Sequence, residues 1–366
     1  MDRRTFLGGV GSALGAFAAG CTAISGRSGE SNGSSADCGD REDRGTYHNP
    51  VFEPVFADPT VTRADDGFFY TYATANDWGD GEGLRVVPIC RSPDFVNWEY
   101  VGEAFDRVPQ WLARTGPADR IWAPDIARYR DRHYLYYSLV DRGPEYALEE
   151  QGIGVATADD PAGPFTDHGK VFQGFEVGVL NSIDPQFYLN DGVPYLLWGS
   201  LNGLYLTELS ADGRRPVGEK TRIGGNRFEA AYVTRRKGYY YLFVSSGVCC
   251  VPPDVTYQVE VGRATSLSGP YETRYGRDLR DSYGTLVMTE SDRFLGPGHN
   301  AIATDDCGTD WLLYHAYDRS DPYLANGPGD PRRSLMLDRL IWEDGWPRVE
   351  NRAPSLAAER PAIDPS

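Results

Sequence analysis

Five segments of the chain share one composition, and their repetition limits the folds that the sequence can adopt. Each is a short run of Tyr, Phe, Leu and Trp next to a turn containing Gly or Asp, which is the pattern of a β-strand. The segments are GFFYTYAT (67–74), RHYLYYSL (132–139), VPYLLWGS (193–200), GYYYLFVSS (238–246) and DWLLYHAYD (310–318). Aligned on one aromatic anchor each, they lie 65, 61, 46 and 70 residues apart; the anchors are Phe69, Tyr134, Tyr195, Tyr241 and Trp311. Each interval has room for one four-stranded sheet with its loops, so the repeat predicts a series of similar sheets.

An ionisable residue stands upstream of each aromatic anchor, at nearly the same distance. The five residues are Asp58, Asp125, Asp184, Glu229 and His299, which precede their anchors by 11, 9, 11, 12 and 12 residues. In a β-propeller each blade is a radial four-stranded sheet, and its innermost strand lines a central channel. If the upstream segment is that strand, all five side chains point toward one axis. Acids that merely occupy turns are the alternative explanation, since Asp and Pro are frequent there.

The repeat therefore predicts an all-β, five-bladed β-propeller over residues 47–355. Composition agrees, because 42 Gly, 25 Pro and 23 Tyr favour many short strands joined by tight turns. The formal net charge of -17 argues against nucleic acid as a partner. Only three of the 36 basic residues are Lys. An acidic surface with so little Lys predicts a halophilic protein, although a GC-rich genome would also favour Arg.

The first 21 residues predict export. MDRRTFLGGVGSALGAFAAGC combines an Arg pair with an apolar stretch too short to span a membrane, as in a twin-arginine secretion signal. Its end resembles a lipoprotein box, with Cys21 as the lipidated residue; alternatively, the signal is simply cleaved and Cys21 is incidental. Residues 22–46 are small and polar and predict a flexible tether, and 356–366 a C-terminal tail. We expect an extracellular monomer, lipid-anchored to the outer face of the cell membrane.

The adjacent residues Cys249 and Cys250 leave two possibilities open. An exported protein can form disulfides, so the pair either forms a bond between neighbours or stays as two reduced, buried thiols. No repeated C-x-x-C spacing indicates a zinc site.

Six motifs resemble glycoside hydrolase family 43, in the order of that family. They are NPVFEPVFADPTV, RIWAPDIARYRDRHYLYYS, NSIDPQFYLNDGVPYLLWGS, RFEAAYVTRRKGYYYLFVSSG, GPGHNAIATDDCGTDWLLYHAYD and RSLMLDRLIWEDGWPRV. The resemblance covers residues 47–349 and implies a five-bladed propeller enzyme acting on arabinan or arabinoxylan. SSGVCCVPPDVTYQVEVGRATSLSGPY is most similar to the endo-1,5-α-L-arabinanases. An exo-acting α-L-arabinofuranosidase or β-xylosidase of the same fold is the alternative, and a non-catalytic glycan-binding lipoprotein is another.

The resemblance also implies catalytic roles. Asp58 matches the general base that activates water, Glu229 the general acid, and Asp184 a third carboxylate that orients the acid and tunes its pKa. Ala230-Ala231-Tyr232 departs mildly from the family pattern after the acid. Glycoside hydrolysis needs one protonated and one ionised carboxyl group on opposite sides of the bond. The family inverts, which predicts a separation of about 6.5–9.5 Å between base and acid.

The resemblance and the local sequence indicate roles for five further residues. The resemblance implies that His299 contacts a calcium ion in the channel, partly through water; a buried His bonded to channel water is the alternative. Trp122 and Trp78 are predicted to bind sugar, with packing between blades an equal alternative for Trp122. Asp125 is interpreted as a structural acid that accepts backbone hydrogen bonds. His315 is interpreted as a packing residue or as a partner that orients another group.

Overall fold

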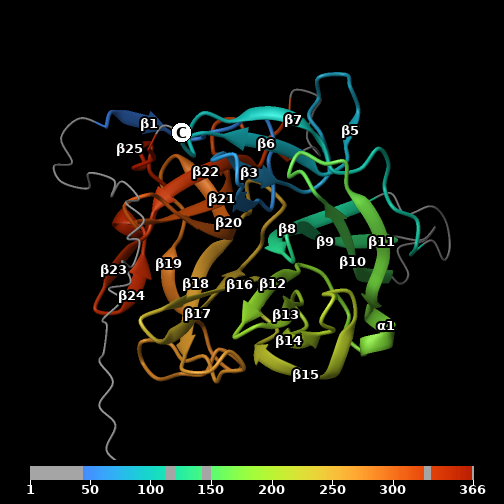
Figure 1. Cartoon of the computed structure of the whole chain (residues 1–366). Helices are drawn as coiled ribbons and strands as arrows, with labels where there is room; N and C mark the ends of the chain where they lie inside the picture. Colours follow the sequence, from blue (N-terminus) through green and yellow to red (C-terminus); the bar gives the residue numbers. More distant parts are fainter. Residues whose placement is uncertain (1–43, 113–119, 142–149, 325–330, 365–366) are drawn as a thin grey trace, which may run out of the picture. The chain divides into compact units, whose positions relative to one another are not determined.

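Five sheets surround a central axis as the blades of a β-propeller (Figure 1). The structure is a computed structural model that describes residues 44–112, 120–141, 150–324 and 331–364. The leader, Cys21 and nearly all of the predicted tether lie outside these residues. Among the described residues no helix has the length and apolarity needed to cross a membrane.

Four blades contain four antiparallel strands in simple succession. Blade 1 consists of β2 (Thr60–Arg63), β3 (Phe69–Tyr72), β6 (Pro88–Ser92) and β7 (Glu99–Glu103). Blade 2 consists of β8 (Arg120–Tyr129), β9 (Arg132–Asp141), β10 (Glu150–Ala158) and β11 (Thr166–Gln173). Blade 3 consists of β12 (Gln186–Asn190), β13 (Val193–Trp198), β14 (Leu204–Leu209) and β15 (Pro216–Gly224). Blade 4 consists of β16 (Phe228–Arg236), β17 (Tyr239–Ser246), β18 (Gln258–Ala264) and β19 (Thr285–Met288).

Blade 5 has three strands within the described residues, β20 (Phe294–Thr304), β21 (Asp310–Asp318) and β22 (Ser334–Arg339). Short elements connect or flank the blades: the hairpins β4–β5 (Asn76–Asp77, Leu84–Arg85) and β23–β24 (Ile341–Glu343, Trp346–Arg348), the helix α1 (Gly174–Val177) and the 3-10 turn η1 (Glu350–Arg352).

The first strand of each blade is the innermost, as the repeat predicts. These strands contact one another in a closed ring: β2 with β8, β8 with β12, β12 with β16, β16 with β20, and β20 with β2. The aromatic segments form the second strands, and in blades 1, 2, 4 and 5 these are buried along nearly their whole length. A second strand packs against the neighbouring blades on both faces, so both sets of its alternating side chains are apolar. The five-bladed, all-β prediction is therefore confirmed.

The N-terminal segment closes the ring at blade 5. The Val51 N–H donates to the Leu335 carbonyl at 2.9 Å, and the Leu335 N–H donates to the Phe52 carbonyl at 3.1 Å. The Asn49 side chain both donates to the Leu337 carbonyl (2.8 Å) and accepts from its N–H (2.9 Å). Residues 49–52 thus occupy the outer edge of β22 and satisfy backbone groups that an open edge would expose.

The C-terminal residues are more ordered than the prediction of a tail over 356–366. β25 (Ala357–Glu359) pairs antiparallel with β1 (Thr46–His48). This pairing joins the two ends of the domain, so ordered structure continues into residues 357–359. The two strands are too far apart in the sequence for any turn signal to indicate that they pair, which is why the predicted boundary is wrong.

Candidate active site

One residue at the axial end of each blade has a left-handed backbone. The five are Asp58 (φ 56°), Ala123 (φ 40°), Asp184 (φ 57°), Ala230 (φ 53°) and His299 (φ 50°). Non-glycine residues rarely adopt this conformation, and it clusters at functional sites where the surrounding structure enforces it. In blades 2, 4 and 5 the pairing register also shifts at this point. Such irregularities redirect side chains, here toward the mouth of the channel.

The N–H groups of these five residues form a cyclic set of hydrogen bonds. Each N–H donates to a side chain of the preceding blade: Ala123 to Thr74 Oγ1 (2.8 Å), Asp184 to Ser138 Oγ (3.0 Å), Ala230 to Asp184 Oδ2 (3.0 Å), His299 to Ser245 Oγ (2.9 Å) and Asp58 to His315 Nδ1 (3.1 Å). This cycle of hydrogen bonds gives each of the five left-handed residues a buried partner for its N–H group. The cycle therefore fixes the axial side chains of all five blades relative to one another.

Asp58 is held as a buried carboxylate. Thr74 Oγ1 donates to its Oδ2 at 2.5 Å, and Arg333 Nη1 donates to its Oδ1 at 3.0 Å. The Nδ1 atoms of His299 and His315 each lie 3.3 Å from Oδ1. Burial alone would raise the pKa of Asp58, but the charge of Arg333 outweighs it and holds that pKa well below its usual range. Asp58 is thus ionised and able to accept a proton.

His315 is neutral and holds Asp58 in position. Its Nδ1 accepts the Asp58 N–H, so the ring proton resides on Nε2. Burial lowers the pKa of His315 to about 4. Its ring also lies parallel to that of Tyr257, with 5.8 Å between centroids. This arrangement supports the interpretation of His315 as a partner that orients another group.

Glu229 and Asp184 stand on neighbouring blades. Ser200 Oγ donates to Glu229 Oε2 at 2.7 Å, and the Tyr257 hydroxyl is within hydrogen-bonding reach of the same carboxyl group. Asp184 contacts the backbone next to Glu229, because its Oδ2 accepts the Ala230 N–H. Burial, followed by the charges of Glu229 and Asp58, raises the pKa of Asp184 well above its usual range.

The three carboxyl groups predicted from the repeat therefore meet at one site, and comparison with known proteins gives this site a family. The model of "Glycosyl hydrolases family 43" matches residues 47–347. The chain belongs to glycosyl hydrolase family 43. It is a glycoside hydrolase.

Similar proteins cover most of this family 43 hydrolase. The extracellular exo-α-(1→5)-L-arabinofuranosidase ArbA of Cellvibrio japonicus is 33% identical, over 81% of this chain and 86% of its own length. The extracellular endo-α-(1→5)-L-arabinanase 1 of Bacillus subtilis is 32% identical, over 79% and 86%. The structure of Cellvibrio cellulosa α-L-arabinanase complexed with arabinohexaose has a TM-score of 0.70 at 32% identity, covering 82% of this chain and 96% of that one.

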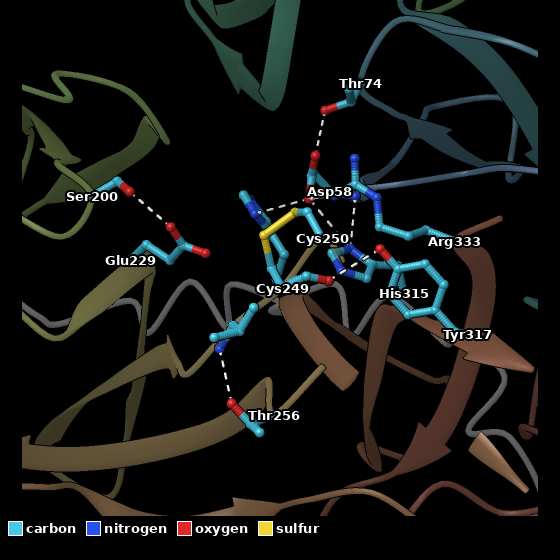
Figure 2. The surroundings of a disulfide bond; sticks show 12 residues. Asp58, Thr74, Ser200, Glu229, Cys249, Cys250, Thr256, His315, Tyr317 and Arg333 are labelled. Atoms are coloured by element: carbon cyan, nitrogen blue, oxygen red, sulfur yellow. Dashed lines mark hydrogen bonds and ion pairs between the residues drawn. A yellow bond between two sulfur atoms is a disulfide. The ribbon is translucent and has the colours of Figure 1, made fainter. Parts of the chain in front are cut away.

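A disulfide between neighbouring residues borders the site of the family 43 hydrolase. Cys249 and Cys250 are bonded, with Cα atoms 3.7 Å apart, which settles the alternative that the sequence left open. Figure 2 shows Asp58, Glu229, His315 and Arg333 around this disulfide. The Tyr317 hydroxyl donates to the Cys249 carbonyl at 3.0 Å and ties the loop to blade 5. Val248 and Val251 on either side are 48% and 61% exposed, so the loop presents an apolar surface.

Asp125 has the structural role that was predicted for it. Its Oδ2 accepts the Phe187 N–H at 2.7 Å and its Oδ1 accepts from Thr60 Oγ1 at 3.1 Å. These contacts join the innermost strands of blades 1, 2 and 3. Burial raises the pKa of Asp125 to about 7.

The two tryptophans differ in their surroundings. Trp122 is partly exposed in β8, opposite Ser138. Trp78 is 9% exposed in a hydrophobic cluster, with its ring 5.6 Å from that of Phe52 and 5.1 Å from that of Tyr100. The Arg85 guanidinium lies 4.7 Å from the Trp78 ring centroid. Trp78 thus packs in blade 1, and little of its surface is accessible to a sugar.

Three contact residues of the site, Thr74, Ser200 and Arg333, were not predicted. Thr74 and Ser200 had a usable signal, because a Ser, Thr or His follows every aromatic anchor by four or five residues. That position is where the second strand reaches the axial face, and its side chain bonds the next blade. Arg333 had no comparable signal, since it lies 275 residues from Asp58 and precedes only β22.

Proposed function

We propose that this family 43 hydrolase is an inverting endo-1,5-α-L-arabinanase. One observation carries the proposal: an ionised carboxylate and a second carboxyl group stand at the same site. Asp58 is the ionised carboxylate and is bound to Arg333. Glu229 is the second carboxyl group, and Asp184 lies next to it. The names of the similar proteins, which include exo- and endo-acting enzymes on α-1,5-linked arabinan, support the substrate class.

In the proposed reaction Asp58 takes a proton from water as the oxygen of that water bonds to the anomeric carbon. Glu229 gives a proton to the glycosidic oxygen as its bond to that carbon breaks. Arg333 and Thr74 keep Asp58 ionised and fix its orientation. Burial and the charges of Glu229 and Asp58 raise the pKa of Asp184, so Asp184 stays protonated beside the acid. Ser200 donates to Glu229 Oε2, so the proton given to the glycosidic oxygen would leave from Oε1.

Calcium is proposed as a ligand of the channel. The described residues contain no group of three or more His, Cys, Asp or Glu side chains arranged around an ion. His299 faces the channel, however, and neither amide atom of the buried Asn300 has a hydrogen-bond partner. Calcium prefers six to eight oxygen ligands, so an ion here would be held by the Asn300 oxygen and by water, with His299 contacting it through water. The ion would supply positive charge near the carboxyl groups.

The proposed setting is the outer face of the cell, because the similar proteins are named extracellular. The twin-arginine leader and the lipid on Cys21 are proposed from the sequence alone, as are the monomeric state and the adaptation to salt.

Reducing-sugar release from debranched linear arabinan and from xylan tests the proposed activity. The wild type is expected to cut arabinan into a ladder of oligosaccharides in high salt with calcium, and Glu229→Gln is expected to be inactive. Glu219→Gln, which removes an exposed acid on β15, serves as the matched control. Arabinose as the sole product would assign the exo activity instead. Cleavage of xylan alone would refute the substrate, and binding of arabinan without cleavage would favour a glycan-binding protein.

A further inference from the structure

An exposed tyrosine is stacked on an arginine near the acid side of the site. Tyr283 is 66% exposed, and the Arg227 guanidinium lies 3.6 Å from the centre of its ring. The cation covers one face of the ring and restrains it. Neither residue takes part in the proposed acid–base chemistry.

Backbone contacts place this pair beside Glu229. Arg227 precedes β16, whose second residue is Glu229. The Phe228 carbonyl between them accepts the N–H of Leu201 at 2.9 Å. Leu201 is 46% exposed and follows Ser200, the hydrogen-bond donor to Glu229. Two groups therefore border the same side of Glu229: Leu201 from blade 3 and the Arg227–Tyr283 pair from blade 4.

A buried glutamate anchors the loop that carries Tyr283. Glu260 is 1% exposed and accepts hydrogen bonds from Ser246 Oγ (2.6 Å), Gln258 Nε2 (2.8 Å) and the N–H of Gly284. Ser246 is paired with Phe228 across β16 and β17. The carboxylate thus links the residue after Tyr283 to the strand of the acid. Three donors offset the cost of burying that charge, and they fix the loop in place.

From these contacts we propose that Tyr283, stacked on Arg227, is a binding platform for the leaving-group part of the arabinan chain. This inference rests on the proposed function and names a subsite of the same cleft. Because Glu229 protonates the leaving oxygen, the departing sugars lie on the Glu229 side. An aromatic ring contacts the C–H face of a sugar, while the guanidinium donates hydrogen bonds to hydroxyl groups. Leu201 borders the same path from the neighbouring blade 3.

Kinetics on arabino-oligosaccharides of two lengths test the platform. For Tyr283→Ala we expect kcat/KM for arabinohexaose to fall roughly three- to tenfold, mainly through KM, with a much smaller change for arabinotriose. Tyr283→Phe keeps the ring and should behave like the wild type. Tyr275→Ala, which removes a tyrosine that is 81% exposed in the same connection between β18 and β19, is the matched control. Arabinohexaose binding to Glu229→Gln, with and without Tyr283→Ala, gives a readout independent of turnover.

The outcomes separate the inference from the proposed function. An equal loss on both oligosaccharides, or a loss no larger than that of Tyr275→Ala, would overturn the platform while the arabinanase activity stands. A melting temperature of Tyr283→Ala far below that of Tyr283→Phe, with equal KM values at low temperature, would reduce the residue to a structural role. A wild type that neither cuts nor binds arabinan would refute both.

Discussion

Replacing Asp125 by Asn is expected to change how the stability of the protein depends on pH. Burial raises the pKa of this carboxyl group from 3.8 to about 7. Between these pH values the folded protein holds the proton whereas the unfolded chain releases it. The stabilisation that this group contributes is therefore complete below about pH 4 and is lost as the pH rises through about 7. Each pKa unit corresponds to about 1.4 kcal/mol. From about pH 5 to about pH 8 the wild type should lose about 3 kcal/mol through this group alone.

Asn has nearly the same shape and cannot ionise, so the variant escapes this loss. Its oxygen can accept the Phe187 N–H, and its NH₂ group can donate to Thr60 Oγ1. The substitution lowers the free energy of unfolding by about 1 kcal/mol at every pH, because the Thr60 hydroxyl must find another acceptor. The difference in unfolding free energy between variant and wild type should therefore shift by about 3 kcal/mol in favour of Asn across that pH range.

Urea unfolding at several pH values, with salt and calcium held constant, measures this difference. Asp159→Asn, which removes an acid whose side chain is 85% exposed, is the control and should follow the wild type. Activity of Asp125→Asn on arabinan should stay within a few-fold of wild type, because both carboxyl oxygens already serve the scaffold. A pH-independent difference would refute the buried, protonated state, and inactivity in a stably folded variant would assign Asp125 to the chemistry.

Three further predictions concern the surroundings of the site. Ser200→Ala removes the donor to Glu229 and should lower kcat by roughly tenfold with little change in KM; a raised KM at unchanged kcat would instead make Ser200 a substrate ligand. Replacing Cys249 and Cys250 together by Ser should raise KM several-fold, and a thiol reductant should do the same to the wild type; unaffected kinetics would show that the disulfide does not border bound substrate. Chelation should lower both the melting temperature and the activity, and calcium should restore them; if chelation changes neither, no ion occupies the channel.

The repeat makes the fold and the three carboxyl groups predictable for one physical reason. A second strand packed on both faces needs apolar residues throughout, which marks each blade in the sequence. The innermost strand precedes it at a nearly constant distance, so the amino-acid sequence alone is enough to align Asp58, Asp184 and Glu229.

Residues whose position depends on loops cannot be predicted in this way. Arg333 reaches Asp58 from an approach to β22 that has no counterpart in the other blades. Trp78 stands in the polar sequence NDWGDGEG, which suggests exposure, yet the β4–β5 hairpin folds back and buries its ring against Phe52. Tyr283 carries no local sign of its partner, because the stacking Arg227 lies far away in the sequence, in the connection between β15 and β16.

Closure of blade 5 by the N-terminal segment has a consequence for biosynthesis. Asn49 leaves the ribosome early, but its partner Leu337 follows 288 residues later. At about 5–20 residues per second, the first part of the domain waits roughly 15 to 60 s for the edge that it covers. Until then the ring is open and the outer edge of the last blade does not exist. The propeller therefore reaches its final form only after nearly the whole chain has been translated. The last step joins the residues translated first to those translated last.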